Sequence, residues 1–221
     1  YIICVPTSIN IDHTPNLNPL KEASKKIGSL LKNDDLVIYE STVYPGVTED
    51  ICLPILEEYS SLTCGANFHL AFSPERINPG DQLHQMRNVV KLISGQTKKS
   101  LDKVKDIYSK VFNDKIYICP SIKVAESSKL LENTQRDLNI ALVNEFSYLA
   151  HKLDINIQDI LAAAKTKWNF MDVKPGFPGG ECIPIDPYYY IFLANQFNLR
   201  ASLASNARDI IASFNYLEGM I

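Results

Sequence analysis

Apolar and polar residues alternate in blocks along the first half of the chain, in the order typical of β-α units. Short apolar runs predict strands over residues 1–5, 36–40, 68–72, 89–94 and 116–119. Segments with apolar residues at helical spacing lie between them, over residues 18–31, 48–59 and 97–112. We therefore expect an α/β domain with a mostly parallel sheet.

Two local signals make more specific predictions in this half. The run over residues 1–5 is apolar throughout, which is typical of a strand buried on both faces. Asn18 followed by Pro19 predicts an N-cap and the first turn of a helix. The sequence therefore predicts that the chain starts inside a sheet.

After residue 120 the pattern changes to long helices. Ser121 can cap a helix over residues 121–152. The apolar positions of this helix recur at helical spacing: Leu131, Leu138, Leu142 and Leu149. Asn156 predicts the cap of a second helix over residues 157–166, and helical spacing returns over residues 201–221. This part of the chain is expected to be mainly helical.

Charge and cysteine content exclude several classes of function. The formal net charge is -3 and the basic residues are spread along the sequence, so neither a nucleic-acid partner nor a membrane surface is expected. The five cysteines form no C-x-x-C pair and the four histidines have no metal-ligand spacing, so we expect neither disulfides nor a metal. No apolar run reaches the roughly 20 residues that span a bilayer. The cysteine pattern is typical of a reducing compartment, so a cytoplasmic protein is expected.

A loop rich in glycine and proline, over residues 174–187, carries the strongest candidate chemistry. Gly179 and Gly180 come shortly before Cys182, and Asp186 follows it by four residues. Glycines let backbone amides approach a ligand closely, and a carboxylate near a thiol can orient water or accept a proton. A lone cysteine is more often a small buried residue, but the surrounding glycines and prolines favour a reactive thiol.

Four polar side chains share one face of the helix predicted over residues 121–152. They are spaced by three or four residues: Glu126, Lys129, Asn133 and Arg136. Such a stripe could stabilise a negatively charged oxygen, although a solvated face with one ion pair is the commoner meaning of a charge stripe. Asn133 favours the first interpretation because asparagine prefers helix caps to helix interiors.

Polar loops follow three of the predicted strands, at the ends that parallel strands share. They contain Pro6 and Thr7, then Thr42, and then Glu75, Arg76 and Asn78. Ligands of open α/β sheets bind at this edge. Each loop alone is an ordinary turn, and their common location makes a binding site an equally good interpretation.

The nine glycines contain no G-x-G sequence. A dinucleotide site normally opens with a strand, G-x-G-x-x-G and a helix, whose amides hold the pyrophosphate. Because residues 1–5 are predicted to form a buried strand, we expect this missing unit to precede residue 1. The chain is then a fragment, and the fragment alone is expected to be inactive.

Five motifs follow one another in the chain: V-P-T, S-T-V-Y-P-G, S-P-E-R-I-N-P-G, A-E-x-x-K-x-x-x-N and G-G-x-C-I-P-x-D-P-Y-Y. Together, over nearly the whole chain, they resemble the UDP-glucose and UDP-N-acetylhexosamine 6-dehydrogenases, which are NAD-dependent nucleotide-sugar dehydrogenases. The N-acetylhexosamine branch is the more similar. The resemblance implies the remainder of an N-terminal NAD-binding, Rossmann-like domain over residues 1–120. It also implies a helical central domain, which forms a homodimer in this family, over residues 121–221.

In this family the primary alcohol of a UDP-sugar is oxidised to the uronate in two NAD-dependent steps, and the resemblance implies a role for each matching residue. Cys182 would attack the intermediate aldehyde and form a thiohemiacetal, then a thioester. The charged oxygen would be stabilised by Lys129 and Asn133. Water and protons would be handled by Thr42, Glu75 and Asp186. The NAD side would be lined by Val5, Pro6, Thr7 and Thr42. The UDP-sugar side would be lined by Glu75, Arg76, Asn78, Lys129, Asn133, Gly179 and Gly180.

The sequence departs from the family pattern at two points. Glu181 stands where this branch commonly has histidine, and a carboxylate beside a thiol opposes thiolate formation unless it points away. The glycine-rich cofactor loop and the family's C-terminal domain have no counterpart in this sequence. A non-catalytic homologue, or a module for dimerisation and nucleotide-sugar binding, is therefore the alternative function. A β-hydroxyacid-type dehydrogenase is a third, but such enzymes need no thiol like Cys182.

Overall fold

The computed structural model describes residues 1–77, 88–178 and 183–218. The chain divides into two compact units, Tyr1–Leu130 and Leu131–Ile221. One helix, α4 (Ile122–Lys152), contributes its first turns to the first unit and the rest to the second. The domain boundary expected at residue 120 stays a prediction, and each unit is described by itself below.

A five-stranded sheet forms the centre of the first unit, in the order β1-β4-β5-β6-β7. The strands are β1 (Ile2–Ile3), β4 (Leu36–Tyr39), β5 (His69–Phe72), β6 (Lys91–Gly95) and β7 (Ile116–Ile118). Neighbouring strands run parallel, except that β5 and β6 are antiparallel. The predicted α/β fold with a mostly parallel sheet is confirmed.

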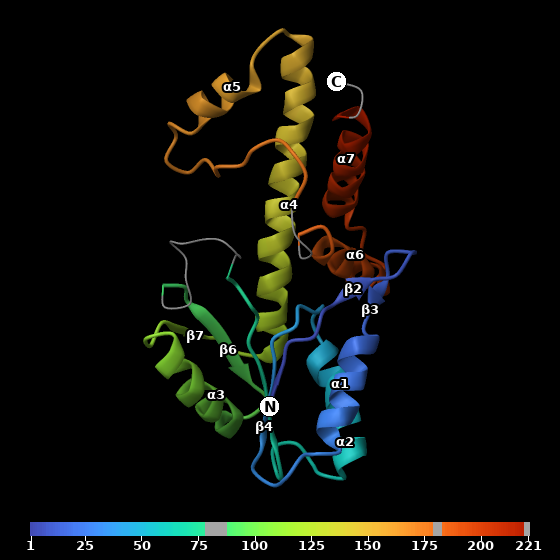
Figure 1. Ribbon diagram of the computed structural model, residues 1–221, viewed down its shortest axis with the longest axis vertical. Coiled ribbons are helices and arrows are strands. Elements are labelled where there is room, and N and C mark those ends of the chain that lie inside the picture. Colours follow the sequence, from blue (N-terminus) through green and yellow to red (C-terminus); the bar gives the residue numbers. More distant parts are fainter. Residues whose placement is uncertain (78–87, 179–182, 219–221) are drawn as a thin grey trace. The chain divides into compact units, whose positions relative to one another are not determined.

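Helices cover both faces of this sheet (Figure 1). The π-helix η1 (Val47–Cys52) continues into α2 (Leu53–Ser60), which packs with α1 (Asn18–Gly28) on one side. On the other side, α3 (Lys98–Val111) packs against Ile38, Ala71 and Ile93. The next residue of β4, Tyr39, points the opposite way, and its hydroxyl lies 2.6 Å from the Ser24 hydroxyl of α1. Both faces of the central strands are therefore buried, as their apolar runs predict.

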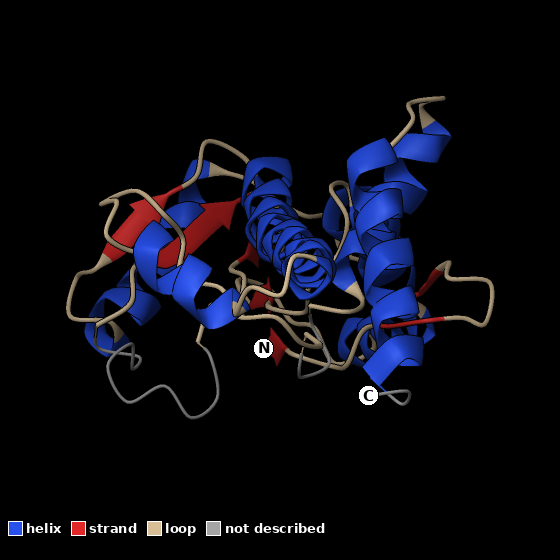
Figure 2. Ribbon diagram, turned by 90° about the horizontal axis from the view of Figure 1, so that it is seen from above, coloured by secondary structure: helices blue, strands red, loops and turns tan. Residues whose placement is uncertain are grey.

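Three features of the first unit differ from the sequence-based predictions. The first strand is not buried on both faces, since Ile2 is 53% exposed. Within the described ranges β1 pairs with β4 alone. Asn18 is not the N-cap of α1; that position is Leu17, and the Asn16 side chain accepts a hydrogen bond from the Asn18 amide at 3.1 Å. A small hairpin of β2 (Ser8–Ile9) and β3 (Pro15–Asn16), which was not predicted, lies apart from the main sheet (Figures 1 and 2).

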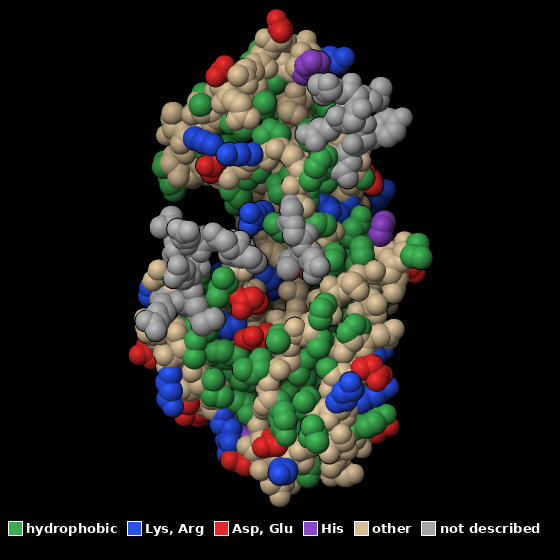
Figure 3. Space-filling model, in the orientation of Figure 1, with side chains coloured by type: hydrophobic (Ala, Val, Ile, Leu, Met, Phe, Trp, Pro, Cys, Tyr) green, Lys and Arg blue, Asp and Glu red, His purple; other side chains and the backbone are tan. Residues whose placement is uncertain are grey.

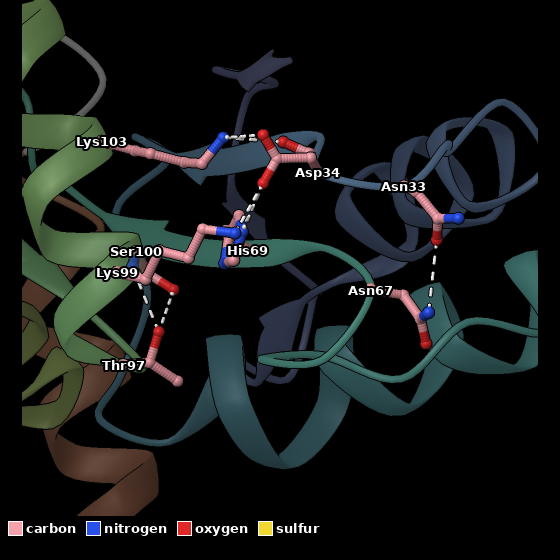
Figure 4. A network of polar contacts seen from close by, with 8 residues as sticks. All are labelled: Asn33, Asp34, Asn67, His69, Thr97, Lys99, Ser100 and Lys103. Atoms are coloured by element: carbon pink, nitrogen blue, oxygen red, sulfur yellow. Dashed lines mark hydrogen bonds and ion pairs between the residues drawn. The ribbon is translucent and has the colours of Figure 1, made fainter.

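A polar network ties α3 to the loop that enters β4 (Figure 4). The Asp34 carboxylate accepts hydrogen bonds from Lys103 at 2.7 Å and Lys99 at 2.8 Å, and the His69 ring nitrogen Nε2 lies 3.1 Å away. These contacts, with Lys103 first, hold the pKa of Asp34 well below its usual range. Because the side chain is largely exposed, the network orients the elements more than it stabilises them.

The second unit contains the rest of α4 and three further helices, α5 (Ile157–Ala164), α6 (Asp186–Gln196) and α7 (Ser202–Glu218). The Asn156 side chain accepts a hydrogen bond from the Gln158 amide at 2.9 Å, so the predicted cap of α5 is confirmed. Apolar residues of α4, α5 and α7, together with Val173 from the segment after α5, form a core of this unit: Ile140, Ala141, Val143, Leu161, Val173, Ala207 and Ile211.

Helix α6 was not predicted. Pro187 occupies its first turn, where the missing N–H of proline costs nothing. Most of the following residues are aromatic or aliphatic and give no polar face, so the segment lacks the alternation that predicts a surface helix. None of the helices in the described ranges is long and apolar enough to cross a membrane. Basic and acidic side chains are interspersed on the face drawn in Figure 3.

Candidate active site

The carboxyl ends of β1, β4 and β5 lie side by side, because Ile3 pairs with Tyr39 and Tyr39 pairs with Phe72. The chain leaves β1 through residues 5–7 and leaves β4 through Ser41 and Thr42. The Ser41 hydroxyl donates to the Val5 carbonyl at 2.7 Å and so ties the first two loops together. The sheet register therefore brings four predicted cofactor residues to one edge: Val5, Pro6, Thr7 and Thr42.

The third loop of this edge carries Glu75 and Arg76. The Glu75 carboxylate accepts hydrogen bonds from the backbone amides of Arg76 at 2.7 Å and Ile77 at 2.6 Å. The Arg76 guanidinium donates to the Val90 carbonyl at 2.9 Å. The loop thus folds back on itself, and the Glu75 side chain stays about half exposed, where a ligand or water can reach it.

A buried lysine that the sequence analysis did not select, Lys91, supports this loop. Because β6 is antiparallel to β5, its first residue lies at the same edge. The Lys91 ammonium donates to Glu40 at 2.8 Å and to the Pro74 carbonyl at 3.3 Å, and it lies 3.8 Å from Glu75. The Tyr108 hydroxyl also donates to Glu40, at 2.6 Å, and burial followed by this bond raises the pKa of Tyr108. A lysine at the start of an apolar strand is the sequence signal that could have identified it.

Glu126 does not act with the polar stripe of α4 in the way the spacing suggested. Its side chain is completely buried in the first unit and accepts hydrogen bonds from the backbone amides of Gly46 at 2.7 Å and Thr48 at 3.0 Å. Burial raises the pKa of Glu126 to about 7, although these amide donors lower it. Nearby, Lys123 forms an exposed ion pair with Asp50 at 3.0 Å.

In the second unit, two predicted site residues meet. The Asn133 amide donates a hydrogen bond to the Asp186 carboxylate, which is only 2% exposed at the start of α6. Lys129, one turn before Asn133 on α4, belongs to the first unit and is partly exposed. Arg136 is exposed. An amide held by a buried carboxylate keeps its second N–H available to another acceptor.

A buried ion pair of Asp137 and Arg208, which the sequence analysis also missed, joins α4 to α7. The Arg208 guanidinium donates to both oxygens of Asp137, in one case at 2.9 Å, and to the Pro184 carbonyl at 3.3 Å. Burial raises the pKa of Asp137 to about 6, against the lowering effect of Arg208. The sequence shows Asp137 as an acidic residue among apolar helix positions, and this signal could have identified it. It does not show that the partner is Arg208, because the two residues are 71 positions apart.

Asn144 fixes the chain near the start of the loop over residues 174–187. Its amide oxygen accepts from the Gly176 N–H at 2.8 Å, and its amide nitrogen donates to the Gly176 carbonyl at 2.9 Å. Gly176 has a φ of 142°, a conformation that favours glycine. Four predicted site residues lie outside the described residues: Asn78, Gly179, Gly180 and Cys182. Glu181 lies outside them too.

Comparison with known proteins identifies the family. Residues 1–112 match the family model for the NAD binding domain of the UDP-glucose/GDP-mannose dehydrogenase family, and residues 123–212 match the model for its central domain. The chain therefore belongs to the UDP-glucose/GDP-mannose dehydrogenase family, and the family resemblance predicted from the five motifs is confirmed.

Individual curated relatives and a solved structure resemble the chain over most of its length. The chain is 50% identical to Protein CapL of Staphylococcus aureus, over 88% of this chain and 46% of that protein. It is 49% identical to a UDP-N-acetyl-D-glucosamine 6-dehydrogenase of Salmonella typhi, over 86% of this chain and 44% of that protein. A solved UDP-D-ManNAc dehydrogenase structure from Pyrococcus horikoshii matches with a TM-score of 0.90 and 33% identity, over 99% of this chain and 51% of that one. The chain thus spans about half the length of the curated relatives it matches.

Proposed function

We propose that this chain carries part of the active site of an NAD-dependent UDP-N-acetylhexosamine 6-dehydrogenase, which oxidises the primary alcohol of the sugar to the uronate. The observation that carries the proposal is the hydrogen bond from Asn133 to the buried Asp186. Asn133 lies on α4, the helix that also bears Lys129. The hydrogen bond joins two residues of separate family motifs, in a chain 49% identical to a UDP-N-acetyl-D-glucosamine 6-dehydrogenase.

The residues present fit one end of a dinucleotide. Val5, Pro6, Thr7 and Thr42 line the carboxyl edge of parallel strands, where the nicotinamide end would lie. The glycine-rich loop that would hold the pyrophosphate has no counterpart among the nine glycines. When bound, NAD supplies the hydride acceptor for the oxidation.

The side chains divide the remaining chemistry. The Lys129 ammonium and the free N–H of the Asn133 amide stabilise negative charge on the substrate oxygen. The Cys182 thiolate adds to the aldehyde carbon and forms a thiohemiacetal, which would become a thioester when its hydride passes to a second NAD. Water then hydrolyses the thioester, which releases the acid and returns the thiol. Asp186 orients Asn133, and the half-exposed Glu75 and Thr42 handle protons and water.

A turnover experiment in the full-length protein tests the proposal. With UDP-N-acetyl-D-glucosamine and NAD, two NADH are expected per sugar. Lys129→Ala should slow the first hydride transfer by about a hundredfold, because one donor to the charged oxygen is lost. Lys152→Ala, at the exposed end of the same helix, should leave the rate unchanged. Binding of the UDP-sugar without NADH formation would instead favour the non-catalytic binding module.

A second proposed property is self-association through α4. Three apolar side chains of this helix and a fourth just after its end form one exposed stripe: Leu142 at 55%, Phe146 at 47%, Leu149 at 51% and Leu153 at 58% exposure. A stripe spaced by four, three and four residues needs a covering surface, and a second copy of the chain supplies a matching one.

Light scattering at micromolar concentration should therefore give the mass of a dimer. Leu142→Glu should shift the mass toward the monomer, because a charge in an apolar interface is costly. His151→Glu introduces the same charge on the opposite, exposed side of α4 and should leave the dimer intact. A monomeric wild-type chain with its helices intact would contradict the proposed interface.

A further inference from the structure

Glu126 has an unusual environment for a carboxylate. It lies in the first turns of α4, its side chain has no exposed surface, and its two oxygens accept hydrogen bonds from the amides of Gly46 and Thr48. These amides stand about 80 residues earlier in the chain, where η1 begins. A buried carboxylate is costly unless its oxygens are satisfied, and here both accept N–H groups at a helix start.

We infer that Glu126 is a positioning residue for the reaction, which fixes the Thr42 loop against the helix that carries Lys129. The inference rests on the proposed function for the roles of Thr42 and Lys129. Glu126 itself touches neither substrate nor cofactor; it acts through the backbone of the loop over residues 41–46.

The loop is held at both of its ends. At the start, the Ser41 hydroxyl bonds to the Val5 carbonyl. At the other end, Gly46 turns the chain into η1 with a φ of 101°, and a Cβ there would lie only 2.6 Å from an Asp50 oxygen. The hydrogen bonds from the Gly46 and Thr48 amides to Glu126 then fix the position of this turn against α4. Thr42 therefore lies between a fixed strand end and a fixed helix start.

The position of Glu126 on α4 links this loop to the proposed oxyanion donor. Lys129 follows Glu126 by three residues, which is less than one helical turn. Both belong to the first unit, so the link runs within one compact body. A shift of η1 relative to α4 would then change the distance between Thr42 and the Lys129 turn, whereas the Glu126 bonds oppose such a shift.

A matched control joins the same two elements. The ion pair of Lys123 and Asp50 also connects α4 to η1, but its side chains are 52% and 64% exposed. Exposed pairs of this kind hold elements weakly. Lys123→Ala therefore removes a contact between α4 and η1 without disturbing the buried carboxylate.

Amide hydrogen exchange on this chain at pH 8, where the Glu126 carboxyl is mostly ionised, tests the tie itself. In Glu126→Ala the Gly46 and Thr48 amides should exchange at least about tenfold faster. Glu126→Gln keeps one acceptor oxygen, so only one of the two amides should exchange faster. This variant provides the test if Glu126→Ala does not fold. Lys123→Ala should change neither. Unchanged exchange in both Glu126 variants would overturn the inference.

Kinetics of the full-length protein test the positioning role. Glu126→Ala should lower kcat about tenfold or more with little change in KM for the UDP-sugar. Combined with Thr42→Ala, its effect should largely vanish, because both changes disable the same loop. Independent, multiplying effects would overturn the positioning role. If the Glu126 variants exchange these amides faster but the wild-type protein oxidises no UDP-sugar, the contact between Glu126 and the loop is supported and the proposed function is overturned.

Discussion

Cys182→Ala in the full-length protein is expected to release at most one NADH per UDP-sugar and no uronate. Without the thiol, the aldehyde made in the first oxidation has no covalent attachment for the second. Lys129→Ala differs, because it should slow both oxidations while keeping the final ratio of two NADH per sugar. A single-turnover experiment that counts NADH and identifies the sugar product separates the two variants.

Cys64→Ala is the appropriate control, because burial, and then the nearby Glu57, raises the pKa of the Cys64 thiol to about 11. That thiol is protonated at neutral pH and should contribute nothing to turnover. If Cys182→Ala still produced two NADH and free uronate at the wild-type rate, Cys182 would be a structural residue. The position of Glu181 beside it would then need no catalytic explanation.

Arg208→Ala is expected to lower the free energy of unfolding by about 3–5 kcal/mol. The substitution leaves Asp137 buried without its partner, and it also removes the donor to the Pro184 carbonyl. Denaturant titration of this chain measures the loss. Arg200→Ala, at an exposed position, should change the stability by less than about 0.5 kcal/mol.

The loss in Arg208→Ala should shrink as the pH is lowered from 8 to 5. Burial already raises the pKa of Asp137 to about 6, and removal of Arg208 takes away the group that lowers it. The folded variant then keeps a proton that the unfolded chain releases, so its stability falls as the pH rises. Replacing both partners with apolar residues should cost less than Arg208→Ala alone. An equal loss at both pH values would contradict this account.

Helices and strands were predictable where apolar residues form a continuous run or recur at helical spacing. The apolar runs of the central strands β4 and β5 and the spacing of α1 and α3 mark those elements within a few residues. By contrast, β1 has a central-strand sequence but one described neighbour, and apolarity alone does not reveal the number of neighbours. The hairpin of β2 and β3 is too short for a period, and α6 lacks a polar face.

The candidate site was predictable at the level of residue type and less so at the level of contact. The motifs selected Asn133 and Asp186, which meet, whereas the helical spacing placed Glu126 on the same stripe as Lys129. Glu126 differs from the other residues of the stripe because its side chain is buried against the Gly46 turn. Helical spacing does not predict this burial, which depends on how α4 packs on η1. Lys91 and Arg208 were missed because their partners are distant in sequence and spacing rules reach only a few residues along a helix or strand.

Asn144 pairs with Gly176 as one peptide group pairs with another across an antiparallel ladder, since it accepts from the N–H and donates to the C=O of the same residue. One side chain of α4 therefore makes the pair of hydrogen bonds that a neighbouring strand would make with its backbone. An aspartate of the same shape would offer only acceptors and would face the Gly176 carbonyl with like charge. Position 144 therefore requires a side-chain amide, and another polar group would not serve. Through this amide, α4 fixes the backbone of the loop at Gly176.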